Sequence, residues 1–205
     1  MNYLNTRANE VVSFKTATLN GLGAKGGLYV PESIPELPHS FFEQIEDLSD
    51  VEIATTVLWP FVEGSLTHNE LSKIVGETLS FPTPVKHISK NIHVLELFHG
   101  PTMAFKDVGA RFISRCLAQF VKEGSETTVL VATSGDTGSA VANGFANVDG
   151  IKVKILFPKG KVSPFQEHQM TSLGGNIQAL EVDGTFDDCQ ALVKQAFNDD
   201  ALKKK

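Results

Sequence analysis

From Ile92 onward, short apolar and β-branched runs alternate with longer segments in which apolar residues recur at helical spacing. The runs that predict strands are IHVLEL at 92–97, TTVLVAT at 127–133, IKVKILF at 151–157 and NIQALEV at 176–182. The segments that predict helices begin near Asp107 and at SGDTGSAVANGFA, SPFQEHQMTSL and TFDDCQALVKQAF. Such alternation is typical of βαβ units with right-handed crossovers. The fold class predicted for this part is α/β, with a parallel sheet covered by helices on both faces.

Several of these helices carry start signals. Ser163 to Gln166 reads as a capping box with Pro164 at the first helical position, and Thr185 with Asp188 offers a similar arrangement. The helix after Lys106 has an apolar stripe that we expect to face the sheet. The stripe consists of Phe112, Ile113, Cys116, Leu117 and Phe120.

The first eighty or so residues follow a different pattern. Residues 12–19 alternate like a strand with one exposed face, residues 26–38 are rich in turn formers and prolines, and helices are predicted over 51–62 and 67–79. The second helix opens with a capping box of Thr67 and Glu70. Phe81-Pro82-Thr83-Pro84 then reads as a linker. We therefore expect a small N-terminal α+β domain over 1–82 and a second domain over 83–205.

Composition narrows the classes of function. The chain has 205 residues and a net charge of −6, which argues against a nucleic-acid binder. Its apolar runs are too short for a membrane span, and the N-terminus lacks the features of a signal peptide, so a cytoplasmic protein with no membrane partner is expected. Cys116 and Cys189 fit reduced structural thiols.

Residues 21–26, Gly-Leu-Gly-Ala-Lys-Gly, match the dinucleotide-binding pattern GxGxxG. That motif needs a helix that starts at the glycines and holds a pyrophosphate on its free amides. Here the chain continues into GLYVPESIP, which is not such a helix. We therefore interpret the glycines as a turn.

Thr133-Ser134-Gly135-Asp136-Thr137-Gly138 lies between a predicted strand and a predicted helix. At this place the free N–H groups of a helix start meet the carboxyl edge of a parallel sheet, where anions bind. The hydroxyls of Ser134 and Thr137 add donors for a carboxylate or phosphate. The alternative is a well-capped helix start with no ligand, and the pattern alone does not decide between them.

Lys106 stands in HGPTMAFKDVGARF, directly after Ala104 and Phe105 and directly before a predicted helix. A lysine in the first turn opposes the helix dipole, whereas the following Asp107 suits it. One interpretation is a solvated surface lysine. The other is an amine held against apolar neighbours at the end of the first strand, where desolvation would lower its pKa and favour a Schiff base with a carbonyl.

Other catalytic patterns are missing from the sequence. The six histidines include His87, His93 and His99 without HExxH or short paired spacing, so we predict no metal site. The nucleophile elbow GxSxG is also absent from the sequence.

HGPTMAFKDVGARF and VLVATSGDTGSA together resemble the pyridoxal-phosphate enzymes of fold type II, and among them the threonine synthase family. The resemblance extends to MNYLNTR, to GGLYVPESIP and to FPKGKVSPFQEHQMTSLGGNIQALEVDGTFDDC, so it covers essentially the whole chain. It implies the three-layer αβα architecture of the tryptophan synthase β-like class and pyridoxal 5'-phosphate as the cofactor.

The resemblance also implies roles for individual residues. Lys106 corresponds to the lysine that forms the cofactor Schiff base and moves protons, and Phe105 and Asp136 to residues beside the cofactor. The turn residues correspond to the loop that holds the substrate's α-carboxylate; they are Thr133, Ser134, Gly135, Thr137 and Gly138. The implied reaction converts O-phospho-L-homoserine and water to L-threonine and phosphate, with the cofactor as electron sink.

The sequence departs from the family in one respect. The family's glycine-rich loop for the cofactor phosphate, GNFGN, does not occur in it, and Gly174-Gly175-Asn176 precedes a predicted strand rather than a helix. We therefore expect a truncated chain that is inactive alone and can self-associate through an uncovered sheet edge. The alternatives are another fold type II enzyme, such as a serine or threonine dehydratase or a cysteine synthase, and a catalytically silent fragment.

Overall fold

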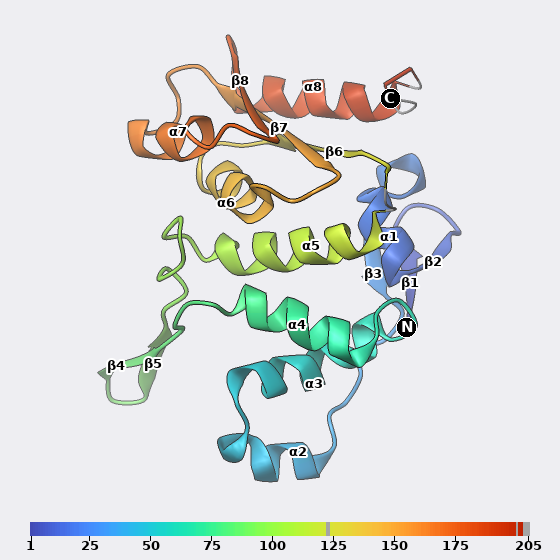
Figure 1. The fold of residues 1–205 in the computed structure, drawn as a ribbon, viewed down its shortest axis with the longest axis vertical. Helices are drawn as coiled ribbons and strands as arrows, with labels where there is room; N and C mark the ends of the chain where they lie inside the picture. The colour runs from blue at the N-terminus through green and yellow to red at the C-terminus, as the bar shows by residue number, and fades with distance from the viewer. Residues whose placement is uncertain (122–123, 200, 203–205) are drawn as a thin grey trace. The chain divides into compact units, whose positions relative to one another are not determined.

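The computed structural model describes residues 1–121, 124–199 and 201–202. Within these ranges the chain forms two compact units (Figure 1). One unit comprises Met1–Ser80 and Arg115–Phe120, and the other comprises Phe81–Ser114 and Val121–Lys205.

The N-terminal unit begins with an antiparallel sheet. Strand β1 (Asn2–Asn5) lies between β2 (Val11–Ser13) and β3 (Tyr29–Pro31). The chain passes from β2 directly into α1 (Phe14–Asn20), so the prediction of a strand over 12–19 is wrong beyond Ser13. The Thr16 amide donates to Ser13 Oγ at 3.2 Å and caps the helix start, which a short alternating pattern does not reveal. The glycines of 21–26 end α1 and form the short 3-10 helix η1 (Ala24–Gly26), in keeping with a turn.

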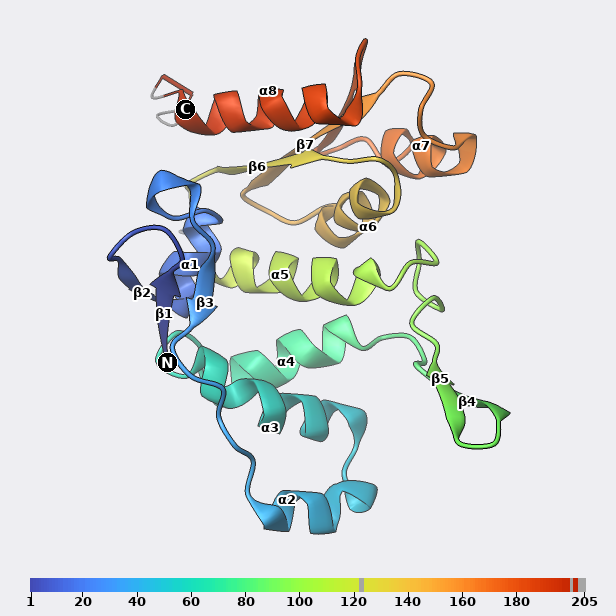
Figure 2. The ribbon, with the colours of Figure 1, turned by 180° about the vertical axis from the view of Figure 1, so that it is seen from behind.

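The same unit continues with helices. The two predicted helices are confirmed as α3 (Asp50–Val62) and α4 (His68–Thr78), which lie side by side (Figure 2). The capping box of Thr67 and Glu70 is present at the start of α4. The apolar sides of α3 and α4 are buried at Val62, Leu71 and Val75. The segments α2 (His39–Gln44) and η2 (Ile45–Asp47) precede them and have no counterpart in the prediction.

The second unit contains a parallel sheet whose described strands are β6 (Thr127–Ala132), β7 (Ile151–Pro158) and β8 (Ile177–Val182), in that spatial order. Helices α6 (Asp136–Phe145) and α7 (Pro164–Thr171) lie on one face and α8 (Phe186–Asn198) on the other (Figures 1 and 2). The predicted three-layer αβα arrangement is therefore confirmed. Its centre is β7, whose alternate residues Ile151, Val153, Ile155 and Phe157 are buried.

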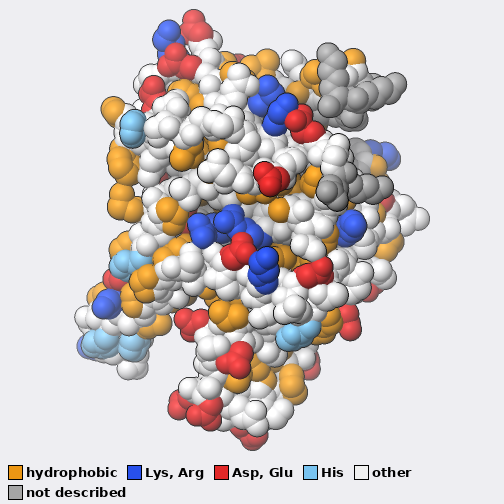
Figure 3. All heavy atoms as spheres, in the orientation of Figure 1, with side chains coloured by type: hydrophobic (Ala, Val, Ile, Leu, Met, Phe, Trp, Pro, Cys, Tyr) orange, Lys and Arg blue, Asp and Glu red, His pale blue; other side chains and the backbone are white. Residues whose placement is uncertain are grey.

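The segment 92–97 was expected to start this sheet, and that prediction is wrong. β5 (Ile92–Leu95) instead pairs antiparallel with β4 (Val85–Ser89) in a separate hairpin whose residues are all exposed. Lys90, with φ 47°, closes the turn. Strands so close in sequence pair with little loop-closure entropy, which favours the local partner. Apolar side chains and histidines gather over this hairpin (Figure 3).

Helix α5 (Lys106–Phe120) also differs from the prediction. Cys116, Leu117 and Phe120 of its stripe are buried, but Ile113 is 37% exposed. α5 packs through Ala110 against Gly144 of α6. The end of the stripe belongs to the N-terminal unit, where the Phe120 ring contacts the Phe14 ring at 5.9 Å between centroids.

Two glycines in helices offer a matched test of packing. Gly76 in α4 has open space where a Cβ would lie, whereas a Cβ on Gly144 would lie 3.0 Å from the backbone carbon of Ala110. Gly76→Ala should raise the free energy of unfolding by about 0.5–1 kcal/mol through helix propensity. Gly144→Ala should lower it by about 1 kcal/mol, because overpacking against backbone exceeds the same gain. Urea unfolding measures both, and equal stabilisation would show that α5 does not pack on α6 as described.

Burial raises the pKa of the Cys116 thiol from 9.0 to about 12. The folded protein therefore keeps the thiol protonated at a pH where the unfolded chain ionises it. The resulting stability is complete below pH 9.0 and is lost as the pH rises toward about 12. The difference in unfolding free energy between the unchanged chain and Cys116→Ala should shrink over that range, and a constant difference would contradict a buried thiol.

Candidate active site

The loop before α5 is closed by a buried carboxylate. Asp107 is 1% exposed and accepts hydrogen bonds from the Thr102 amide at 2.9 Å and from Thr102 Oγ1 at 2.5 Å. Gly100 packs on this pair, because a Cβ there would lie 2.5 Å from Asp107 Oδ2. The Asp107 amide donates to the Ala104 carbonyl at 3.0 Å. These contacts fix where α5 begins and place Lys106 at its first residue.

Lys106 is partly exposed, with 33% of its side chain accessible. Its Nζ lies over the Phe105 ring, 4.5 Å from the centroid, and 3.8 Å from Asp136 Oδ2. Phe105 is itself 62% exposed. The structure thus brings together the three residues assigned to the cofactor, although Lys106 follows a loop rather than the end of a strand.

The turn between β6 and α6 is held from inside by Thr133. This residue is 1% exposed, and its Oγ1 accepts hydrogen bonds from the Gly135 amide at 3.0 Å and the Gly138 amide at 2.8 Å. Gly135 has φ 147°, a value that L side chains rarely adopt. A Cβ on Gly138 would lie 2.5 Å from Met170 Sδ and from Thr133 Cγ2. Thr133, Gly135 and Gly138 therefore shape the turn from its buried side.

The remaining turn residues face solvent. Ser134, Asp136 and Thr137 are exposed, and their amides take part in none of the hydrogen bonds found within the described ranges. Free amides at the start of a helix attract anions. The hydroxyls of Ser134 and Thr137 lie at the same helix start. The arrangement can therefore bind a small carboxylate or phosphate within reach of the Lys106 amine.

Two further residues, Asp107 and Gln166, hold this site together, and the sequence pattern assigns neither of them to it. The pattern explains Asp107 by its charge near a helix start. Gln166 was considered only as a capping residue, but its Nε2 donates to Asp136 Oδ1 at 2.5 Å. The full capping box expected at Ser163 is not formed, because Gln166 Oε1 accepts from Ser163 Oγ at 2.9 Å and not from the Ser163 amide; Ser163 Oγ still accepts from the Gln166 amide at 3.3 Å. The sequence signal for Gln166 is a glutamine at the third helical position, and helix capping explains such a glutamine as well as a role in the site does.

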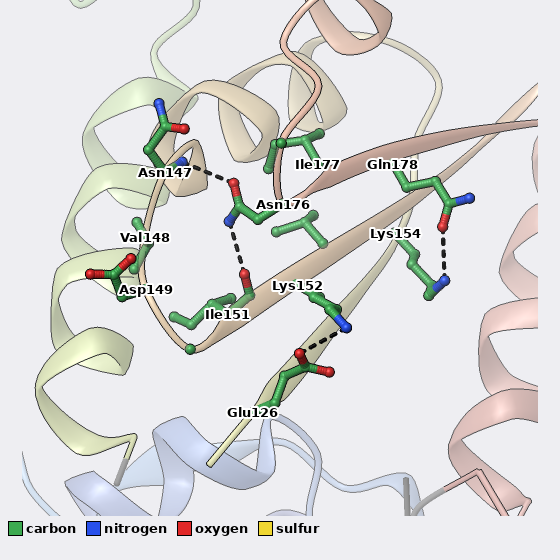
Figure 4. Close-up of a pocket in the computed structure, with 13 residues that line it drawn as sticks. Glu126, Asn147, Val148, Asp149, Ile151, Lys152, Lys154, Asn176, Ile177 and Gln178 are labelled. Carbon is green, nitrogen blue, oxygen red and sulfur yellow. Dashed lines mark hydrogen bonds and ion pairs between the residues drawn. The ribbon is translucent and has the colours of Figure 1, made fainter. Parts of the chain in front are cut away.

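An open hollow of about 750 Å³ lies at the opposite, amino-terminal edge of the sheet (Figure 4). Four of its polar side chains form two pairs: Lys152 pairs with Glu126 at 2.8 Å and Lys154 donates to Gln178 at 2.8 Å. Within the described ranges, no group of His, Cys, Asp or Glu is arranged to hold a metal ion, and no helix is long and apolar enough to cross a bilayer. The chemistry suggested by the sequence therefore lies at Lys106 and the turn.

Two known protein families match the two parts of the chain. Residues 76–203 match the family described as pyridoxal-phosphate dependent enzyme, and residues 2–79 match the family described as threonine synthase N terminus. The threonine synthase of Haemophilus influenzae is 44% identical over 205 residues, which are 100% of this chain and 48% of that protein.

Two solved structures extend the similarity to the fold. The Escherichia coli threonine synthase has a TM-score of 0.91 and 42% identity, with 99% of this chain and 47% of that chain covered. The pyridoxal-phosphate-bound threonine synthase of Brucella melitensis has a TM-score of 0.86 and 42% identity, with 98% and 45% covered.

The chain belongs to the pyridoxal-phosphate dependent enzyme family. Within that family its resemblance is to the N-terminal part of threonine synthases, and it spans about half the length of the curated relatives it matches.

The anchor of the loop before α5 can be tested directly. Asp107→Asn replaces a buried acceptor with an amide that turns an N–H toward one of the Thr102 donors. We expect the free energy of unfolding to fall by about 1–3 kcal/mol, measured in urea. Asp187→Asn, at an exposed position in the first turn of α8, is the matched control and should change it by less than about 0.5 kcal/mol. Equal effects of the two substitutions on the free energy of unfolding would contradict the role of the buried Asp107 carboxylate as the anchor of this loop.

Proposed function

We propose that this chain carries the lysine and the carboxylate-binding turn of a threonine synthase, which converts O-phospho-L-homoserine and water to L-threonine and phosphate. The assignment to a carbon–oxygen lyase acting on phosphates is part of the proposal. It is supported by the match of residues 2–79 to the threonine synthase N terminus and by the 44% identity to the Haemophilus influenzae enzyme. The observation that carries it is the convergence of Lys106, Phe105 and Asp136 beside the free amides of α6.

These residues fit pyridoxal phosphate. Lys106 presents a partly exposed primary amine, the group that condenses with an aldehyde. The exposed Phe105 ring offers an apolar surface next to that amine. The Asp136 carboxylate can accept a hydrogen bond from a hydroxyl group on a ring bound there. When bound, the cofactor would withdraw electrons from the substrate carbon that loses a proton.

The protein's own groups would then act on the substrate. The amides and hydroxyls of Ser134 and Thr137 would hold its α-carboxylate at the start of α6, where the helix dipole favours negative charge. Lys106 Nζ would take the proton from Cα and return it to the substrate in a later step, because its amine lies 3.8 Å from Asp136 of this turn. Thr133, Gly135 and Gly138 would keep the turn in shape.

Two further points belong to the same proposal. We propose that the partner is a small anionic substrate and that the protein works in the cytoplasm. In the described sheet β6 and β8 each pair on one side. Their open edges favour self-association, which light scattering across a concentration series would detect as a rise in mass.

The test of the cofactor site measures covalent attachment of pyridoxal phosphate to lysines. It does not measure turnover, because the chain spans about half of its relatives' length. The purified chain is mixed with pyridoxal phosphate, reduced with borohydride and mapped by mass spectrometry. We expect the adduct chiefly on Lys106, and its loss in Lys106→Ala. Lys159→Ala, which removes an amine 64% exposed, is the control and should leave the Lys106 adduct unchanged. Labelling spread over many lysines in all three proteins would refute the proposed site.

A further inference from the structure

Gln166 of α7 connects two elements of the candidate site. Its Nε2 donates to Asp136 Oδ1 at 2.5 Å, and its Oε1 accepts from Ser163 Oγ at 2.9 Å. The other oxygen of Asp136, Oδ2, lies 3.8 Å from Lys106 Nζ. A continuous polar chain therefore runs from Ser163 through Gln166 and Asp136 to the amine of Lys106.

The direction of the Gln166 amide is fixed by chemistry. An ionised carboxylate only accepts hydrogen bonds, so the atom facing Asp136 must be the NH₂ group. Ser163 Oγ already accepts from the Gln166 backbone amide at 3.3 Å, and its own proton is free to donate to Oε1. Rotating the amide by half a turn would place an oxygen against the carboxylate and a nitrogen against the hydroxyl. The Asp136 carboxylate therefore decides the orientation, since the Ser163 hydroxyl can donate or accept.

Packing restrains the same amide. A Cβ on Gly135 would lie 2.5 Å from Gln166 Oε1, 2.6 Å from its Cδ and 2.7 Å from its Nε2. The Gln166 amide thus packs directly on Gly135, in the space that a side chain at position 135 would occupy. Hydrogen bonding and packing together give Gln166 little freedom at the point where it meets Asp136.

We infer that Gln166 is a positioning residue that holds the Asp136 carboxylate beside Lys106 and thereby sets how readily this amine reacts. Asp136 is 53% exposed at the side chain, so without the bond from Gln166 it would sample rotamers directed into water. Held in place, the carboxylate keeps the Lys106 amine in an ion pair at 3.8 Å, and an amine held in this pair is less free to attack a carbonyl. The inference rests on the proposed function only in taking that carbonyl to be the aldehyde of pyridoxal phosphate.

The amine's reactivity can be measured without the cofactor. The whole chain is treated with trace acetic anhydride at neutral pH, and the acetylation of each lysine is compared by isotope-ratio mass spectrometry. Gln166→Met keeps the length of the side chain but removes its donor. We expect Lys106 to acetylate between about twofold and about fivefold faster in this variant, the range that a partly exposed ion pair allows. An unchanged or slower rate would overturn the inference.

Matched variants separate positioning from a general loosening of the fold. Gln178→Met removes an amide that accepts from Lys154 at the other edge of the sheet and should leave the Lys106 rate unchanged. If Gln166→Met fails to fold, Gln166→Asn takes its place, because it is too short to bridge Ser163 and Asp136. In the Asp136→Asn background, Gln166→Met should have no further effect on the Lys106 rate. An equal effect with and without the carboxylate would show that Gln166 does not act through Asp136.

The outcome is independent of the borohydride test. If pyridoxal phosphate labels lysines without preference while Gln166→Met still accelerates acetylation of Lys106, the proposed function fails and the positioning role stands. If Lys106 is labelled selectively but its acetylation is the same in both proteins, the positioning role fails and the cofactor site stands.

Discussion

The candidate site depends on a buried carboxylate that must be satisfied. Asp107 is 1% exposed, and a charge at such a depth is costly unless donors surround it. Thr102 supplies two, its amide and its hydroxyl, from five residues earlier in the chain. Satisfying Asp107 therefore closes the HGPT loop and fixes the first turn of α5. The position of the Lys106 amine is a consequence of that closure, because Lys106 immediately precedes the anchored residue.

The turn before α6 follows the same principle with a hydroxyl in place of a carboxylate. Thr133 Oγ1 accepts from two amides of the turn and so satisfies part of the helix start from within. The amides of Ser134, Asp136 and Thr137 make none of the hydrogen bonds found within the described ranges, and these residues are the exposed ones. Each motif thus contains buried residues that fix its conformation and other residues whose polar groups are directed toward solvent. The inward group includes Asp107, Thr133 and Gly138, and the outward group includes Lys106, Ser134 and Thr137.

Much of the fold was predictable because its signals are local. Capping residues such as Thr67 and Thr185 mark helix starts, and β-branched runs mark β6 and β7. The errors arose where a nearby partner outcompeted a distant one. Residues 92–95 pair with 85–89 across a tight turn instead of joining the parallel sheet. At Ser13 a single side-chain cap converts an alternating segment into α1. A pattern read one segment at a time does not reveal such competition.

Of the candidate site, the sequence indicated the residues that we propose carry the chemistry and not those that support them. A lysine after an apolar pair and a glycine-rich turn are unusual enough to attract notice, and the structure places Lys106 within 3.8 Å of Asp136. Gln166 lies thirty residues beyond Asp136, and its position at a helix start already had a sufficient explanation. Its role depends on which way its amide points, and that follows from the Asp136 carboxylate, which accepts its N–H. A residue whose function consists of connecting others becomes visible once those others are placed in space.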